Sequence, residues 1–264
     1  MWTDKLAFIG AGNISEVFMD RLISIGSITP SHVFACDVRA DRRTYLRIRF
    51  KGLHTSEDPR EAVQFAPCVI VATPPPMVLP VLKEIRPLLT KQHVIICLAT
   101  AVSLAKLEEA LGDLQVVRAA INIPSLVGEG MNAVAFGSKV TPETRKSICT
   151  LLDLFGRKLE VNDEQMDFWV AIYAAGPACI LPVIDALAKA AVARGIGHAQ
   201  ALTGAAQIVL GAARMVLQTG KDPVDLEKLS AGLRTAQAEE GHKLYTEAFE
   251  AAAAELKELA SVTT

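Results

Sequence analysis

The residues with the clearest chemical potential lie near the N-terminus, where Gly10, Gly12 and Ser15 follow an apolar run at 6–9. Their spacing approximates Gly-x-Gly-x-x-Gly, the turn that joins a strand to a helix and receives the pyrophosphate of a dinucleotide. The first glycine allows a tight turn and the second lets the backbone approach the phosphates, while Ser15 is small enough to replace the third. Free N–H groups at the helix start favour the anion. The pattern predicts a dinucleotide-binding loop, with a bare strand–helix turn as the alternative.

A carboxylate and a basic cluster follow the second expected strand, at 32–36. Asp37 lies about 20 residues after Ser15, where an acid hydrogen-bonds the ribose 2′-hydroxyl of NAD. Three arginines come directly after it: Arg39, Arg42 and Arg43. They could hold the 2′-phosphate of NADP, or form the solvated start of a helix. The acid favours NADH and the arginines favour NADPH, so the sequence leaves both cofactors open.

Further candidates stand where the next expected strands end. Ala72, Thr73 and Pro75 follow the third strand, Ala99 follows the fourth, and Asn122 follows the fifth. Ligands of an open parallel sheet bind outside the carboxyl ends of its strands, so we expect these residues to border the cofactor. A rigid turn in the proline-rich segment and a turn-capping role for Asn122 are the alternatives.

The composition argues against several classes of protein. Of the 264 residues, 51% are hydrophobic and 21% are charged, which favours a folded core over a disordered chain. The formal charge of −2 and the 5% aromatic content argue against a nucleic-acid surface and an anionic-membrane anchor. Five separated cysteines without a C-x-x-C pair and five scattered histidines indicate reduced packing residues and no metal site.

The order of the apolar runs predicts the fold. Short β-rich runs alternate with helical segments up to about residue 160, which is typical of a Rossmann-type doubly wound parallel sheet. The expected strands are 6–9, 32–36, 69–72, 94–98, 116–119 and 132–136. Small residues and helical patterns dominate afterwards. We therefore expect a dinucleotide-binding domain at 1–160 and an all-α dimerisation and substrate domain at 161–264, whose alanine-rich helices pack closely as in an intersubunit bundle.

One stretch, at 168–184, is apolar enough to be compared with a membrane span, but Gly176, Pro177 and Pro182 interrupt it. Alanine-rich helices flank it, so a helix buried against protein is the better interpretation. The first residues show no charged leader followed by an apolar segment. We expect a cytoplasmic protein without a membrane partner.

Three motifs resemble the pyrroline-5-carboxylate reductase family. The segment 8–14 is similar to the family's FIGxGNM start, 117–131 to its xRxMPNTPxxVxxGM segment, and 175–179 to its GSGPAY helix. The resemblance covers nearly the whole chain. It implies a Rossmann domain followed by a helical domain that interlocks into a homodimer. It also implies hydride transfer from NADPH or NADH to the imine carbon of 1-pyrroline-5-carboxylate, giving proline.

The resemblance also implies roles for individual residues. The phosphates would be contacted by Gly10, Gly12, Asn13 and Ile14. Ala72 and Pro75 match the family's Ala-x-Lys-Pro at the cofactor, and Asn122 matches the asparagine of its MPN segment. Gly176 and Pro177, in the segment similar to GSGPAY, would border the substrate.

The chain departs from the family pattern mainly on the substrate side. The family's SPGGTT loop holds the substrate carboxylate and imine, and it corresponds here to 226–235. Ser230, Arg234 and Thr235 are candidate remnants of that site, and a deletion of the loop is the alternative. Three hypotheses follow: a proline-forming reductase with an altered loop, a reductase of a different imine, and a nucleotide-binding regulatory or assembly protein without turnover. The intact cofactor motifs favour the two reductases.

Imine reduction depends largely on positioning, because hydride transfer requires near contact between the nicotinamide and the imine carbon. The imine must also be protonated. The sequence shows no obligatory histidine or lysine for this step. Tyr173 is the candidate acid and Thr235 a second catalytic candidate, while a tyrosine that only packs in the core is the alternative for Tyr173.

Overall fold

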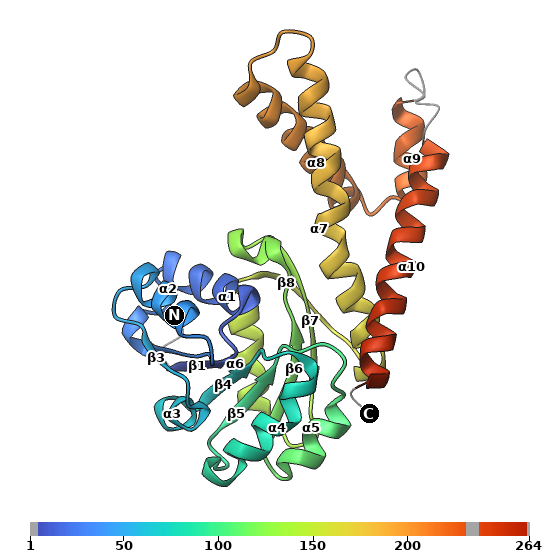
Figure 1. The fold of residues 1–264 in the computed structure, drawn as a ribbon. Helices are drawn as coiled ribbons and strands as arrows, with labels where there is room; N and C mark the ends of the chain where they lie inside the picture. The colour runs from blue at the N-terminus through green and yellow to red at the C-terminus, as the bar shows by residue number, and fades with distance from the viewer. Residues whose placement is uncertain (1–4, 231–237, 263–264) are drawn as a thin grey trace. The chain divides into compact units, whose positions relative to one another are not determined.

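Strands and helices alternate in the first part of the computed structural model, which describes residues 5–230 and 238–262 (Figure 1). The strands are β1 (Leu6–Ile9), β2 (Val33–Cys36), β3 (His54–Ser56), β4 (Cys68–Val71), β5 (Val94–Cys97), β6 (Gln115–Ala120), β7 (Gly130–Phe136) and β8 (Gly156–Glu160). The helices between them are α1 (Asn13–Ser24), α2 (Ala40–Arg49), α3 (Pro59–Phe65), α4 (Pro75–Ile85), α5 (Leu104–Leu111) and α6 (Pro142–Asp153). Short 3₁₀ helices are η1 (Pro30–His32), η2 (Arg86–Leu88) and η3 (Ile123–Val127).

These eight strands form one sheet in the order β3-β2-β1-β4-β5-β6-β7-β8. Neighbouring strands are parallel except β6 and β7. The predicted doubly wound fold is confirmed. The strand order reverses between β1 and β4, which are hydrogen-bonded neighbours. This switch point is where ligands of such sheets bind.

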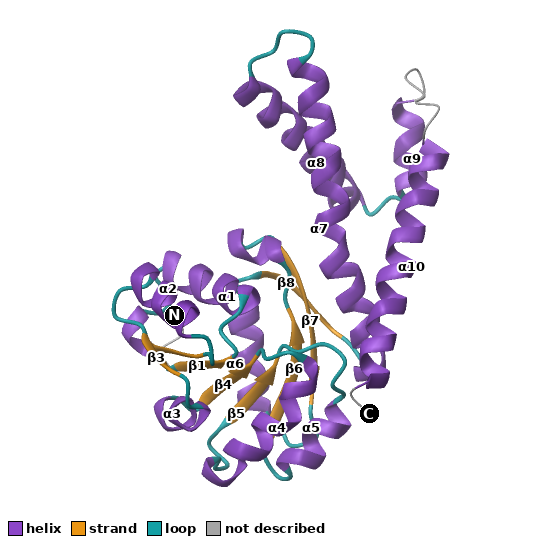
Figure 2. Ribbon diagram, viewed as in Figure 1, coloured by secondary structure: helices purple, strands orange, loops and turns teal. Residues whose placement is uncertain are grey.

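Helices cover both faces of the sheet (Figures 1 and 2). Successive strand residues point to opposite faces, so Leu6 and Phe8 share a core with α1, α2 and α6. Ala7 and Ile9 share the other core with α3, α4 and α5. Because both faces are buried, the central strands are continuously apolar, which is why the sequence shows them clearly.

The structure corrects the predicted sheet in two respects. It adds β3 and β8, which apolar periodicity does not reveal because their residues are largely polar and partly exposed. It also makes β7 antiparallel to β6. Parallel neighbours require a crossover of a dozen or more residues, and only 121–129 connect these two strands.

Beyond β8 the described chain is helical, with α7 (Asp163–Val192), α8 (His198–Thr219), α9 (Pro223–Glu227), η4 (Lys228–Ser230) and α10 (Ala238–Val262). The chain forms two compact units, one within Met1–Ala174 and Ala252–Thr264 and one within Ala175–Ala251. Helix α7 begins in the first unit and continues into the second. The domain boundary expected near residue 160 stays a prediction.

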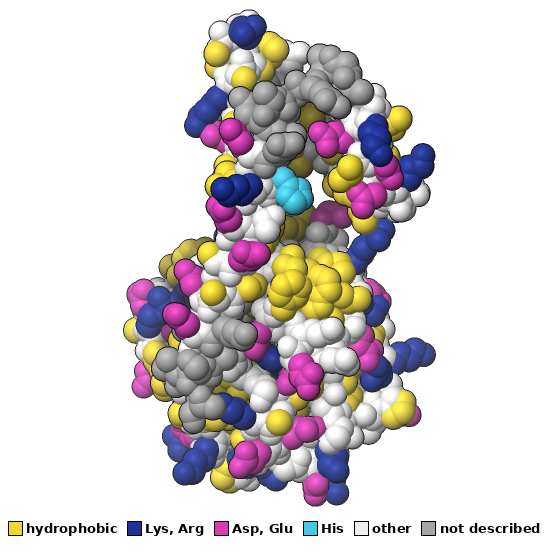
Figure 3. Space-filling model, turned by 90° about the vertical axis from the view of Figure 1, so that its right-hand side faces the viewer, with side chains coloured by type: hydrophobic (Ala, Val, Ile, Leu, Met, Phe, Trp, Pro, Cys, Tyr) yellow, Lys and Arg dark blue, Asp and Glu magenta, His cyan; other side chains and the backbone are white. Residues whose placement is uncertain are grey.

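The described residues of the second unit bury little apolar surface among themselves. Its core cluster consists of Ala188, Ala201 and Ala205, with Ile184 and Ala191 packed against them. Many larger apolar side chains on α7 and α8 are exposed: Ile180, Leu181, Leu187, Val192, Leu202, Ile208, Leu210, Met215 and Leu217. By length and composition alone, both helices also meet the criteria for a membrane span. Figure 3 shows one gathered patch of apolar side chains on the face that it draws, with apolar and charged side chains interspersed around it.

The turn after β1 packs directly against the end of β4. Gly10 has a φ of +87°, and a Cβ added to it would lie 2.6 Å from the carbonyl oxygen of Ala72. Its N–H donates to the carbonyl of Cys36 at 2.9 Å, which ties the turn to β2 as well. Glycine is required by both the backbone conformation and the space. Gly12 differs, because a Cβ added there would meet nothing within 4 Å.

We expect Gly10→Ala to lower the free energy of unfolding by about 2 kcal/mol or more, because left-handed alanine is strained and the methyl would displace the end of β4. Gly12→Ala is the matched control, with an expected loss of less than about 1 kcal/mol. Urea denaturation followed by circular dichroism measures both values. Equal losses in the two variants would contradict the packing described for Gly10.

Candidate functional site

The turn after β1 leads into α1, whose first turn has no side-chain cap. Gly12 is the N-cap residue, and the N–H groups of Asn13, Ile14 and Ser15 have no acceptor within the helix. Such a helix start favours an anion through its free N–H groups and its dipole. The open space at Gly12 also lets a ligand approach the backbone closely. The geometry therefore fits the pyrophosphate that the sequence predicts here.

Ser15 stands in place of the third glycine of the motif and is fully buried. Its hydroxyl donates to the carbonyl oxygen of Gly10 at 2.6 Å. The side chain thus fixes the turn from inside, and its backbone N–H remains the group by which this residue can meet a phosphate.

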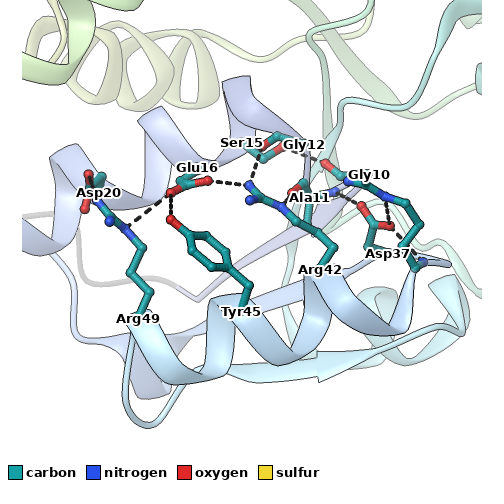
Figure 4. Close-up of polar contacts among 11 residues, drawn as sticks. Gly10, Ala11, Gly12, Ser15, Glu16, Asp20, Asp37, Arg42, Tyr45 and Arg49 are labelled. Atoms are coloured by element: carbon teal, nitrogen blue, oxygen red, sulfur yellow. Dashed lines mark hydrogen bonds and ion pairs between the residues drawn. The ribbon is translucent and has the colours of Figure 1, made fainter.

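Asp37, directly after β2, binds the same turn (Figure 4). Its Oδ2 accepts from the N–H of Ala11 at 3.1 Å, and its Oδ1 accepts from the N–H of Arg39 at 3.0 Å. The side chain is 10% exposed. Asp37 therefore links the end of β2 to the phosphate turn, and this contact is additional to the ribose role that the sequence predicts.

Arg42 of α2 holds the turn from the opposite side (Figure 4). Its Nε donates to the carbonyl of Ala11 at 2.6 Å and its Nη2 to that of Gly12 at 3.2 Å. The same Nη2 pairs with Glu16 of α1 at 2.5 Å. Residue Ala11 is thus held through its N–H by a carboxylate and through its carbonyl by a guanidinium. Sequence reasoning does not reveal this role, because it depends on the packing of α1 against α2.

Glu16 joins several groups of this network (Figure 4). Burial alone would raise the pKa of Glu16, but hydrogen bonds from Arg42 and Tyr45 and the charges of Arg42 and Arg49 bring that pKa below its ordinary value. Tyr45 donates to Oε1 at 2.8 Å. The carboxylate stays ionised at neutral pH and keeps Arg42 in place.

The three arginines considered for a 2′-phosphate have different surroundings. Arg42 is engaged with the turn, and Arg43 donates to the carbonyls of Asp37 and Val38 at 2.7 and 3.0 Å. Arg39 is 58% exposed; its Nε donates to Oδ1 of Asp37 at 3.4 Å, and its terminal nitrogens have no hydrogen-bond partner in the part of the chain that the structure describes. Arg39 is therefore the arginine best able to meet a phosphate beside the end of β2.

The segment after β4 lies against the turn at Gly10. The N–H of Ala72 donates to the carbonyl of Ile9 at 2.8 Å, Pro74 is the N-cap of α4, and Pro75 begins that helix. The Oγ1 of Thr73 is buried and has no partner among the described residues. A buried hydroxyl without a partner costs free energy. An atom of a bound ligand at this edge would satisfy it.

Asn122, after β6, contacts other parts of the chain through its side-chain amide. Its Oδ1 accepts from the N–H of Met131 at 3.2 Å, and its Nδ2 donates to the carbonyl of Tyr173 at 3.4 Å. In an α-helix that carbonyl would accept from residue 177, but Pro177 has no N–H. Asn122 therefore supplies to the carbonyl of Tyr173 the donor that Pro177 lacks.

Tyr173 lies in the core of the first unit and is 7% exposed. Its ring packs against Trp169, with ring centroids 5.4 Å apart. Burial raises the pKa of the phenol, so the group stays protonated at neutral pH. No residue in the described ranges accepts from or donates to its hydroxyl. Tyr173 is therefore a core tyrosine whose hydroxyl makes no hydrogen bond to the described residues.

The remaining candidates lie elsewhere in the chain. Ala99 is 8% exposed and follows β5 at the carboxyl edge of the sheet. Gly176 and Pro177 belong to the second unit, as does Ser230, which ends η4. Arg234 and Thr235 are outside the described residues. The roles of these residues stay predictions.

Two family models match the chain. One described as pyrroline-5-carboxylate reductase dimerisation matches residues 163–259, and one described as NADP oxidoreductase coenzyme F420-dependent matches residues 5–100. The pyrroline-5-carboxylate reductase of Escherichia coli K12 is 32% identical over 237 residues, covering 89% of this chain and 88% of that protein.

Solved structures show the same similarity. The pyrroline-5-carboxylate reductase from Coxiella burnetii aligns with a TM-score of 0.78 at 30% identity, over 97% of this chain and 98% of that chain. The Plasmodium falciparum pyrroline carboxylate reductase with NADP bound aligns with a TM-score of 0.82 at 22% identity, over 98% and 99% of the two chains. At 22% identity, the similarity to the Plasmodium falciparum structure shows a shared fold alone.

We expect Arg39→Ala to raise the Kd for NADPH about tenfold or more, because a charge-assisted hydrogen bond contributes roughly 1.5–3 kcal/mol. The Kd for NADH should change less than about threefold, since NADH has no 2′-phosphate. Fluorescence titration of both cofactors measures the two constants. Arg47→Ala removes the same charge from an exposed position on α2 and is expected to change neither. If Arg39→Ala raised the Kd for NADPH and the Kd for NADH equally, Arg39 would not be a 2′-phosphate residue.

Proposed function

Because the chain belongs to the pyrroline-5-carboxylate reductase family, we propose that it reduces the C=N bond of 1-pyrroline-5-carboxylate with NAD(P)H and forms proline. The observation that best supports this proposal is the phosphate turn at the switch point. Gly10 closes that turn against β4, and the space at Gly12 and the uncapped start of α1 remain open to a dinucleotide. The family resemblance found from three motifs is confirmed.

The residues at the end of β2 support binding of both cofactors. Asp37 can accept from a ribose hydroxyl next to its contact with Ala11, and Arg39 can pair with a 2′-phosphate. We therefore infer that NADPH binds more tightly and that NADH is also used. Thr73, Ala99 and Asn122 would lie on the side of the switch point that receives the nicotinamide.

The bound cofactor supplies the hydride, and the chain must hold the imine in its protonated form. We propose Tyr173 as the donor of that proton, because its hydroxyl has no partner among the described groups. The rest of the rate acceleration would come from positioning of the cofactor and the imine by the residues at the carboxyl ends of β4, β5 and β6.

Turnover tests the proposed activity. We expect NAD(P)H oxidation with 1-pyrroline-5-carboxylate to exceed that with an uncharged cyclic imine, because Ser230 and Arg234 remain candidates for a carboxylate site. Faster turnover of the uncharged imine would instead support the altered-substrate hypothesis. Cofactor binding without turnover of any imine would support a regulatory protein.

The same assay tests the proton donor. Tyr173→Phe should lower kcat about 100-fold while leaving the Kd for NADPH unchanged, since a positioned general acid contributes about 10²–10⁴-fold. A kcat within a few-fold of the unsubstituted protein would assign Tyr173 to packing alone.

We also propose that the second unit forms a homodimer. The buried cluster among its described residues is small, and the exposed apolar side chains of α7 and α8 need a covering surface. The family model described as dimerisation covers this region. A second copy supplies the cover better than lipid does, because α7 begins with Asp163 and Asp167 paired to Arg118 and contains Pro177 and Pro182. The proposed location is the cytoplasm.

Light scattering without detergent should therefore give a mass of at least two chains at micromolar concentration. Ile208→Asp, at a 63% exposed position on α8, is expected to weaken the association at least tenfold, since the charge would be buried in the interface. Ile48→Asp, at a 72% exposed position on α2, is the matched control and should leave the mass unchanged. A stable unsubstituted monomer would contradict the dimer.

A further inference from the structure

A charged cluster lies outside the phosphate turn, at the other half of the sheet. Arg118 on β6 is 2% exposed, although it stands in a strand of apolar residues. Its Nη1 donates to Oδ1 of Asp163 at 2.9 Å, and its Nη2 donates to Oδ1 of Asp167. The two carboxylates are one helical turn apart at the start of α7. One buried guanidinium thus joins the sheet to two acids of the helix.

The same two carboxylates also bind the backbone of the segment 99–104, which follows β5. The N–H of Ala101 donates to Oδ1 of Asp167 at 3.2 Å, and the N–H of Leu104 donates to Oδ2 of Asp163 at 2.7 Å. In these hydrogen bonds Arg118 donates to the two acids, and only the acids bind the segment. It sets the positions of the two acids, and the acids set the position of the segment.

Ala101 has an unusual backbone conformation. Its φ is +64°, and it is the one residue other than glycine with a positive φ in the described ranges. Alanine in this left-handed region is strained and persists only where neighbouring contacts enforce it. The hydrogen bond to Asp167 is such a contact. Strain of this kind concentrates at sites where geometry matters for function.

The cluster is poorly explained as a source of stability. Burying the Arg118 guanidinium costs desolvation that offsets much of its attraction to the two acids, which are 22% and 36% exposed, so the cluster is weak evidence of net stabilisation. The Nε of Arg118 has no hydrogen-bond partner among the residues described, which adds to the cost. A cluster that fixes the conformation of a strained segment is consistent with these costs.

The segment lies where the second half of a dinucleotide would bind. The β1–β2 half carries the phosphate turn and Asp37, so it receives the adenosine half. The nicotinamide half must then lie across the switch point, outside the carboxyl ends of β4 and β5. Residues 99–104 leave the carboxyl end of β5, and Thr73 leaves that of β4.

We propose that Arg118, Asp163 and Asp167 are positioning residues that hold the segment 99–104 against the nicotinamide half of the cofactor. The inference rests on the proposed function for the identity of the cofactor. It adds three residues to the site, each of which acts through the backbone of another segment.

Binding of two ligands tests this proposal: NADPH, and 2′-phospho-ADP-ribose, which lacks only the nicotinamide. We expect Asp167→Ala to raise the Kd for NADPH at least fivefold more than the Kd for 2′-phospho-ADP-ribose. Asp167→Asn keeps an oxygen that accepts from Ala101 and should restore the ratio of the two constants to within about twofold of the unsubstituted protein. Asp153→Ala removes an ion pair with Lys158 in the same unit and is the matched control, with an unchanged ratio.

Equal weakening of both ligands in Asp167→Ala would overturn the proposal, because it would indicate a general structural defect. An unchanged ratio would overturn it as well. Neither result depends on turnover, so failure of this inference is distinct from failure of the proposed reaction. If the unsubstituted protein bound neither ligand, the proposed function and this inference would both be rejected.

Discussion

The close approach of Gly10 to the end of β4 is the constraint on which the site depends. The first strand and the fourth strand of the chain are neighbours in the sheet, and the turn after one must pass over the end of the other. A glycine in the left-handed region allows this passage, because a Cβ at this position would lie only 2.6 Å from the carbonyl oxygen of Ala72. The passage directs α1 so that its free N–H groups face the switch point, where an anion is favoured.

Opposite charges around Ala11 preserve this geometry. Asp37 holds its N–H and Arg42 holds its carbonyl, while the ion pair with Glu16 keeps Arg42 in place. These side chains therefore organise the backbone that is proposed to meet the phosphates, and they leave Arg39, the proposed 2′-phosphate residue, 58% exposed. Arg118 and its two acids play a comparable part at the other half of the sheet. In both halves, charges bound to backbone atoms define the shape presented to the cofactor.

The sequence was sufficient to predict the fold class, the family and the phosphate turn, because these depend on local spacing and on apolar strands buried on both faces. It did not predict β3 and β8, whose polar residues carry no periodic signal, nor the antiparallel β7, which depends on the length of the preceding connection. The roles of Arg42 and Arg118 depend on partners 26 to 49 residues away. An arginine within the apolar run of β6 is the one signal in the sequence that indicates a buried ion pair there.

Transfer of a labelled hydride tests the proposed reaction most directly. With NADPH carrying deuterium on the transferred C4 position and 1-pyrroline-5-carboxylate as substrate, the proposal predicts proline one mass unit heavier, with the deuterium on the former imine carbon. Mass spectrometry and proton NMR of the product would locate the label. Proline without deuterium, or no proline while NADPH remains bound to the protein, would contradict the assignment of this site as a reductase.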